Sequence, residues 1–221
     1  MTQLLKNTLI VLVLCCGSNA MTQTNKVFEP KGSLTADVGI PAQGKNASFG
    51  RVMNGLFNGG VGYQYNIFKG LTVGIGVKYS YFIINTFALN NANWRGGLHM
   101  PSAYGKIGYE KFITERFSIN TSVRMGYTMM VSANDSCKKA MGGPYTEGAF
   151  FAEPQIELLF TAEKESPHGF SLVVGYVFNT AQFGPQYLCM DAIPNLFPED
   201  YVGITRFLSI GFGYRYYMGR K

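Results

Sequence analysis

Apolar and polar residues alternate along eight stretches of the 221-residue chain. The pattern is clearest in residues 71–85, where the bulky side chains share one parity: Leu71, Val73, Ile75, Val77, Tyr79, Tyr81 and Ile83. Small or polar residues, with Lys78, occupy the other parity from Thr72 to Ser80. Successive side chains of a β-strand point to opposite faces, so the alternation predicts strands with one apolar face. The eight predicted strands are residues 33–40, 56–68, 71–85, 102–113, 117–133, 149–163, 170–183 and 203–218.

The connections between these strands alternate between short and long. The short ones are residues 69–70, 114–116 and 164–169. The long ones are residues 41–55, 86–101, 134–148 and 184–202. Outer-membrane barrels have tight periplasmic turns and longer outer loops. We therefore predict an all-β fold, an eight-stranded antiparallel up-and-down transmembrane β-barrel with short periplasmic turns, four extracellular loops and both termini in the periplasm.

A soluble sandwich or lipocalin-like barrel is the competing interpretation, because its apolar face would point inward. The polar face here consists mostly of Gly, Ser, Thr and Asn instead of the many charges usual on a wetted surface, and small residues suit a narrow lumen. Pro154 interrupts the predicted strand 149–163 and removes a ladder hydrogen bond. We expect it near the outer rim, with the lipid-facing residues below it being Ile156, Leu158, Phe160 and Ala162.

The chain begins with the pattern of a secretory signal. Lys6 precedes the apolar run 9–14, and small residues follow up to Ala20. We expect a signal peptide over residues 1–20, a short periplasmic segment over 21–31 and a single barrel domain over 32–221. A lipoprotein signal remains an alternative because Cys15 and Cys16 follow the apolar run.

Composition agrees with a barrel and argues against nucleic-acid binding. The chain has 27 Gly, 17 Phe and 14 Tyr, and its formal charge of +6 becomes +5 when Lys6 is removed with the signal. The only basic clusters are residues 138–139 and 220–221, too few to track phosphates. We expect instead contact with outer-membrane lipid and lipopolysaccharide head groups.

The inward parity carries eight charged residues. We expect them to form a lumen charge network of four acids and four bases: Asp37, Lys78, Lys106, Glu110, Arg124, Glu153, Glu157 and Arg215. Charges in a narrow lumen are costly unless paired, which favours a structural plug. A narrow gated path or a protonation switch is the functional alternative.

The mature chain would keep two cysteines, Cys137 and Cys189, in the third and fourth outer loops. Both loops lie on the same side of the membrane, so a disulfide between them is a candidate, and two unpaired thiols are the alternative. These cysteines and the distant His99 and His168 do not form a metal ligand set. We expect no cofactor. Since no spaced Ser and acid would orient either histidine as a base, we also expect no enzyme.

Apolar residues in two outer loops are the best candidates for a surface that binds an unknown partner. They are Trp94, beside Arg95, and Tyr187, Leu188, Ile193, Leu196 and Phe197. Such residues mark a contact site, a lid over the barrel mouth or a band among lipid head groups, and the sequence does not separate these.

The last strand contains the order polar, any, Gly, any, any, aromatic, any, aromatic over residues 209–216. This order resembles the terminal assembly signal of bacterial outer-membrane proteins, with Gly211, Tyr214 and Tyr216 at the matching positions. The resemblance implies recognition by the barrel-assembly machinery. An ordinary last strand with interfacial aromatic residues would have the same composition.

Residues 32–218 as a whole resemble the small eight-stranded outer-membrane barrels of the OmpA transmembrane-domain and OmpX type, and the outer-membrane β-barrel domain family of Gram-negative bacteria. That scaffold hosts several activities. We expect a non-enzymatic envelope protein with a structural role or with surface interactions through its loops. The alternatives are a narrow channel for small hydrophobic molecules and an accessory outer-membrane component of a secretion system.

Overall fold

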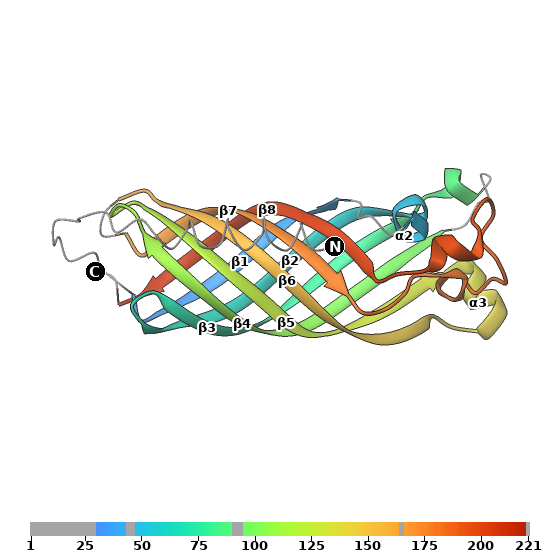
Figure 1. The fold of residues 1–221 in the computed structure, drawn as a ribbon, viewed down its shortest axis with the longest axis horizontal. Helices are drawn as coiled ribbons and strands as arrows, with labels where there is room; N and C mark the ends of the chain where they lie inside the picture. Colours follow the sequence, from blue (N-terminus) through green and yellow to red (C-terminus); the bar gives the residue numbers. More distant parts are fainter. Residues whose placement is uncertain (1–29, 43–46, 90–94, 164–165, 220–221) are drawn as a thin grey trace, which may run out of the picture.

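The computed structural model describes residues 30–42, 47–89, 95–163 and 166–219. Eight antiparallel strands form a closed barrel in which each strand pairs with its sequence neighbours and β1 pairs with β8 (Figure 1). The predicted eight-stranded barrel is confirmed. The expected signal peptide lies outside the described residues. The strands are β1 Gly32–Ala42, β2 Met53–Phe68, β3 Leu71–Ile84, β4 Gly96–Phe112, β5 Phe117–Asn134, β6 Tyr145–Thr161, β7 His168–Asn179 and β8 Thr205–Met218.

The strands are staggered around the barrel, as closure requires. The row of paired residues that starts at Thr35 on β1 reaches Tyr104 on β4 and Thr205 on β8. At the seam, however, Thr35 pairs with Arg215, ten residues beyond Thr205. A row of paired residues therefore climbs along the barrel as it goes round, and neighbouring rows form diagonal layers.

The two ends of the barrel differ in the length of their connections. At one end, β2 and β3 are joined by Lys69 and Gly70, whose φ values of 40° and 87° fit a tight hairpin turn. The long connections at the other end contain the short helices α2 Ala47–Val52, α3 Asp135–Met141, η1 Thr86–Leu89, η2 Pro185–Leu188 and η3 Pro198–Tyr201 (Figure 1). Within the described ranges, no helix combines the length and apolarity needed to cross a bilayer.

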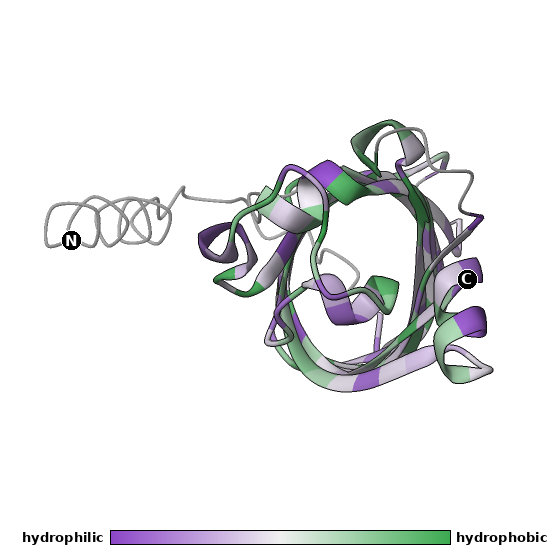
Figure 2. Cartoon of the chain, turned by 90° about the vertical axis from the view of Figure 1, so that its right-hand side faces the viewer, coloured by the Kyte–Doolittle hydropathy of each residue, from purple (hydrophilic) through white to green (hydrophobic). Residues whose placement is uncertain are grey.

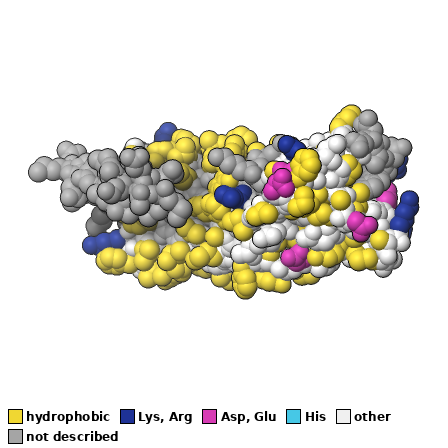
Figure 3. Space-filling model, turned by 45° about the vertical axis from the view of Figure 1, so that its right-hand side comes forward, with side chains coloured by type: hydrophobic (Ala, Val, Ile, Leu, Met, Phe, Trp, Pro, Cys, Tyr) yellow, Lys and Arg dark blue, Asp and Glu magenta, His cyan; other side chains and the backbone are white. Residues whose placement is uncertain are grey.

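The apolar side chains of the strands point out of the barrel and the polar ones point in. Ile75 and Phe212 are both 71% exposed, whereas Asn120, Ser132 and other lumen residues are fully buried. Hydrophobic side chains cover a broad part of the outer wall in Figure 3. A soluble barrel has the reverse arrangement, so the competing interpretation is contradicted.

Several predicted strand ends differ from the structure. β4 begins at Gly96 instead of residue 102, and β6 begins at Tyr145 instead of 149. The prediction read Pro101 as a loop residue, but Pro101 pairs with Tyr79 on β3 and lies where the ladder to β5 is interrupted. A proline has no N–H to donate, so it is tolerated in a strand at a position where one of the two neighbouring ladders is already interrupted.

Pro154 uses the same solution, and its predicted position is wrong. It lies near the middle of β6 instead of at the outer rim. There it pairs with Val123 on β5, while the ladder from β6 to β7 skips it. The side chain is exposed on the outer face, as are those of Ile156 and Phe160.

Candidate functional site

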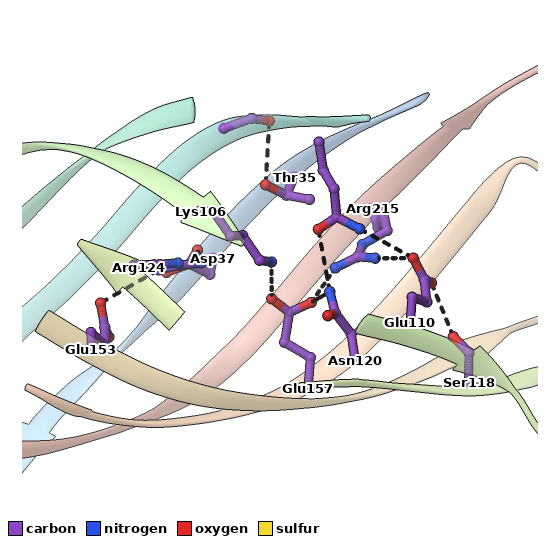
Figure 4. A network of polar contacts seen from close by, with 12 residues as sticks. Thr35, Asp37, Lys106, Glu110, Ser118, Asn120, Arg124, Glu153, Glu157 and Arg215 are labelled. Atoms are coloured by element: carbon purple, nitrogen blue, oxygen red, sulfur yellow. Dashed lines mark hydrogen bonds and ion pairs between the residues drawn. The ribbon is translucent and has the colours of Figure 1, made fainter. Parts of the chain in front are cut away.

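All eight predicted lumen charges point into the barrel, and each lies within 4.0 Å of an opposite charge. Figure 4 shows these residues except Lys78. Their side chains are at most 10% exposed. They come from β1, β3, β4, β5, β6 and β8, so the network ties strands from around the whole wall. We call these eight residues and their polar partners the ionic lumen.

One half of the ionic lumen centres on Glu110 and Glu157, toward the end with short turns. Arg215 pairs with both carboxylates, at 2.8 Å from Glu110, and Lys106 Nζ lies 2.8 Å from Glu157 Oε1. Glu110 also accepts hydrogen bonds from neutral donors: Gln64, Ser118 and Tyr217. This half therefore holds two acids and two bases and has no net charge.

The other half centres on Arg124 and Glu153. Arg124 Nη2 lies 2.8 Å from Asp37 Oδ1, across the barrel on β1, and Arg124 Nη1 lies 3.9 Å from Glu153 Oε2. Lys78 Nζ lies 2.8 Å from the same Glu153 oxygen. The four charges again balance. Buried charges are tolerated when they are paired and hydrogen-bonded in this way.

Glycines on the facing wall make room for these long side chains. The Tyr104 hydroxyl lies so close to β2 and β3 that a Cβ at Gly62 or Gly76 would meet it at 2.9 or 2.5 Å. The Arg124 guanidinium lies over the Tyr104 ring, 4.9 Å from its centre. Glycine in a strand interior often allows this kind of close approach.

At the end with long loops, the barrel interior becomes apolar. Inward residues of the strand ends pack there with loop residues in one buried group, which we call the mouth cluster: Phe49, Val52, Met53, Phe82, Ile84, Leu89, Leu98, Met100, Tyr104, Met130, Ala149, Phe151, Val177, Ala181, Phe183, Tyr187, Leu188, Ile193 and Phe207. Figure 2 looks into this end and shows loop segments crossing the opening. The mouth is therefore closed by the chain's own loops.

The connection 180–204, which we call loop 4, supplies the lid. Tyr187 and Leu188 are fully buried and Ile193 is 2% exposed, whereas Phe197 is 66% exposed. The prediction extended the preceding strand to residue 183, but β7 ends at Asn179 and Phe183 turns into the mouth cluster. Among the three interpretations of these apolar residues, a lid over the barrel mouth fits those that are buried.

Loop 4 is fixed to the barrel by a disulfide and by side-chain hydrogen bonds. Cys137 of α3 is bonded to Cys189, and their Cα atoms lie 4.9 Å apart. Ser132 and Asn134 both donate to the backbone carbonyl of Tyr187. Ser48 of α2 donates to the carbonyl of Phe183 at 2.8 Å. Three separate segments thus hold the lid in place.

Sequence reasoning missed one polar residue in the mouth, Glu147. Its carboxylate accepts hydrogen bonds from Tyr187 at 2.8 Å and from Tyr145 at 3.2 Å. Burial, followed by the hydrogen bond to Glu147, raises the pKa of Tyr187 above its ordinary value of 10.0. Glu147 has the same parity as Glu153 and Glu157. Had the predicted strand begun at Tyr145, this parity would have placed Glu147 on the inward face.

The two histidines lie on the outer face at opposite ends. His99 Nδ1 lies 2.5 Å from the Tyr79 hydroxyl, and His168 Nδ1 lies 2.5 Å from that of Tyr214. These contacts give neither histidine the Ser and acid partners of a hydrolase. In the part of the chain that the structure describes, no three His, Cys, Asp or Glu residues gather to hold a metal ion.

The remaining predicted residues lie at the wall and rim. Gly211 points into the lumen, where a Cβ would meet β1 backbone, while Tyr214 and Tyr216 point outward and are 38% and 39% exposed. Trp94 lies outside the described residues. Arg95 is exposed, and its backbone N–H donates to Asp135.

No protein-family model matches the chain, and no curated protein matches it. Among solved structures, it is similar to the Neisserial surface protein A, with 11% identity, a TM-score of 0.48 and coverage of 85% of this chain and 97% of the other. Ail of Yersinia pestis, solved with the heparin analogue sucrose octasulfate, gives 12% identity, a TM-score of 0.44 and coverage of 86% and 100%.

The outer-membrane protein OprG of Pseudomonas aeruginosa gives 11% identity, a TM-score of 0.42 and coverage of 86% and 98%. Likenesses this distant do not assign a function. The closed ladder of eight antiparallel strands gives this chain the architecture of a small barrel, as the sequence resemblance implied.

Proposed function

We propose that this protein is an integral outer-membrane β-barrel that closes its own lumen, contributes to envelope structure without catalysis and presents its loops for surface contacts. The outward apolar faces supply the lipid-facing band that such a barrel needs. Aromatic residues lie toward both ends of this band, as in membrane-interface belts. They include Tyr63, Tyr65, Tyr109, Tyr214 and Tyr216 near the short turns and Phe57, Tyr79, Tyr81 and Tyr176 near the loops.

The observation that carries the closed lumen is the burial of its charges. Water in an open pore would touch the charged groups along its wall. Arg124 and Arg215 are instead among the largest fully buried side chains, at 2% and 1% exposed. Above them the mouth cluster fills the barrel with apolar groups. The lumen is therefore a packed interior, which supports a structural role over a path for solutes.

Planar-bilayer recording tests this proposal. We expect no single-channel conductance from the native protein, and none from Arg124→Ser, because the mouth cluster remains closed above the substitution. Steady conductance from the native protein would overturn the closed-lumen proposal. Conductance only in Arg124→Ser would show that the ionic lumen is a gate. Heat-modifiable gel migration in the same preparation reports whether the barrel is folded.

The loops offer the surface for partners. Phe87, Phe197 and Val202 are 84%, 66% and 75% exposed, and Lys138 and Lys139 are exposed on α3. Exposed apolar side chains and cations at the loop end suit contact with lipopolysaccharide or with a protein at the cell surface. Removal of Phe87 and Phe197 together should reduce such binding without changing heat-modifiable migration.

Two other roles are separated by experiments on the same material. A hydrophobic-molecule channel would give uptake of a small apolar solute into vesicles, and it requires loop 4 to leave the mouth. An accessory secretion role would give periplasmic partners that co-purify through the short turns. During biogenesis, the barrel-assembly machinery is the proposed partner of β8, through Gly211, Tyr214 and Tyr216.

A further inference from the structure

The outer face of β1 to β4 contains an open apolar hollow. Its floor is the backbone of one row of paired residues, which runs from Thr35 through Gly62 and Gly76 to Tyr104 and Gly126. Outward side chains such as Leu34 and Ile75 form its sides, and these are 48% and 71% exposed. The wall is hollowed here because small residues stand at three outward positions, which are Ala36, Ala103 and Gly105.

Packing within the barrel does not explain why residue 105 is a glycine. The lumen glycines Gly62 and Gly76 lie under the Tyr104 hydroxyl and are needed for internal packing. A Cβ at Gly105, in contrast, would meet no atom within 4 Å, and its backbone conformation is open to any residue. Glycine inside a strand weakens the strand and often marks the close approach of a ligand or another backbone. The approaching group at Gly105 must come from outside the barrel.

The direction of the hollow indicates what it accommodates. One end lies at Tyr214 and Tyr216, near the end of β8 that adjoins the short turns, and the other lies at Gly126, near the middle of β5. It therefore runs diagonally from the short-turn rim toward the centre of the apolar band. The acyl chain of a lipid whose head group lies at that rim would follow this path.

Charge at the short-turn rim gives the chemistry of the head group. Lys31, directly before β1, is exposed and lies three residues before Leu34, which lines the hollow. Lys69, Lys111 and Arg116 are exposed at the same rim, against Glu115 and Glu163. Bases near a membrane surface attract anionic lipid head groups. The Tyr216 hydroxyl at the end of the hollow adds a hydrogen-bond donor for a phosphate, whereas the Tyr214 hydroxyl already contacts His168.

We propose that this hollow is a binding site for one acyl chain of an anionic glycerophospholipid of the periplasmic leaflet, with its phosphate at the short-turn rim near Lys31 and Tyr216. The proposal rests on the membrane address proposed above and adds the lipid class and the face that binds it. Because lipid tails are as apolar as the barrel wall, close packing and head-group charge provide the selectivity.

Native mass spectrometry of barrels released from phosphatidylcholine vesicles containing phosphatidylglycerol tests the site. We expect the native barrel to retain phosphatidylglycerol. Gly105→Phe fills the hollow without an internal clash, and the loss of about ten carbon contacts should lower retention by roughly fivefold or more. Val174→Phe, which adds the same ring on the outer face of β7, should retain lipid like the native barrel.

Lys31→Gln addresses the head group and should lower retention of phosphatidylglycerol by about fivefold while leaving phosphatidylcholine unchanged. Equal retention by the native barrel, Gly105→Phe and Val174→Phe would overturn the proposal and indicate ordinary surrounding lipid. A native dimer that Gly105→Phe dissociates would also overturn it, with a second copy as the occupant. Heat-modifiable migration and silent conductance are read separately, so failure of the lipid site is distinct from failure of the barrel proposal.

Discussion

The ionic lumen and the mouth cluster fill the same barrel with opposite kinds of side chain. The ionic lumen is built from strand residues alone, and its charges pair across the barrel, as Arg124 does with Asp37. The mouth cluster is apolar and needs loop residues such as Phe49 and Phe183 to complete it. Strand pairing therefore fixes the first region, while the second depends on how the loops fold back. The two regions should respond differently to substitution.

The largest effect is expected from removing a cation of the ionic lumen. Arg215→Met leaves Glu110 and Glu157 without their shared partner, and breaking a buried pair costs about 3 to 5 kcal/mol. Urea unfolding of the vesicle-inserted barrel, followed by heat-modifiable migration, measures this loss. Lys139→Met on the exposed face of α3 is the control and should change the free energy of unfolding by at most about 0.5 kcal/mol. Equal losses would show that the lumen pairs are not needed.

A truncation in the mouth cluster should be the next largest. Phe207 is 1% exposed, and its ring centre lies 5.0 Å from that of Phe82. Phe207→Ala should lower the free energy of unfolding by about 3 kcal/mol because it leaves a cavity. Phe212→Ala, on the outward parity of the same strand and 71% exposed, should cost less than about 1 kcal/mol. A larger cost at Phe212 would reverse the assignment of the two faces.

Removing the disulfide separates the lid from the lumen beneath it. The double variant Cys137→Ser, Cys189→Ser should lose about 2 kcal/mol of stability, since a cross-link between residues 52 apart no longer restrains the unfolded chain. Protease cleavage in loop 4 should become faster, while conductance stays silent because the ionic lumen remains paired. Conductance in this variant would mean that the lid alone closes the barrel.

The smallest effect concerns the Tyr187 hydroxyl. Tyr187→Phe removes its hydrogen bond to Glu147 and should cost about 1 kcal/mol. Because the folded-state pKa of Tyr187 is raised above 10.0, the unfolded chain loses this proton first, so native stability falls as pH rises past the unfolded value. Between a pH below that value and a pH above it, the free energy of unfolding should fall less in Tyr187→Phe than in the native protein. An identical fall would place the titrating group elsewhere.

Alternation assigns the charged residues to one parity of their strands, because successive side chains of a strand point to opposite faces. All eight predicted charges share the inward parity in the structure, including Arg124 and Glu153. Which acid meets which base was not predictable, since the pairs depend on the stagger of the strands. Arg215, for example, reaches Glu157 from a strand two positions away around the barrel.

The mouth cluster was beyond the same reasoning. Its loop residues contact strands far away in sequence, as Phe49 of α2 does with Phe207 of β8, and no periodic pattern encodes such contacts. The two prolines show a related limit. Pro101 and Pro154 were read as signs of a loop and a rim, but each lies where only one of its two ladders is complete.

The central claim is that inward and outward parities separate a packed interior from acyl chains, and adjacent residues of β7 test it most directly. Val173 is 7% exposed and points inward, whereas Val174 is 39% exposed and points outward. We would introduce single cysteines at each position, label them with a fluorophore in vesicles and measure quenching by brominated acyl chains, with the unsubstituted chain as background. Strong quenching at residue 174 and little labelling or quenching at residue 173 is the predicted result. Quenching at residue 173 but not at 174 would contradict the membrane barrel.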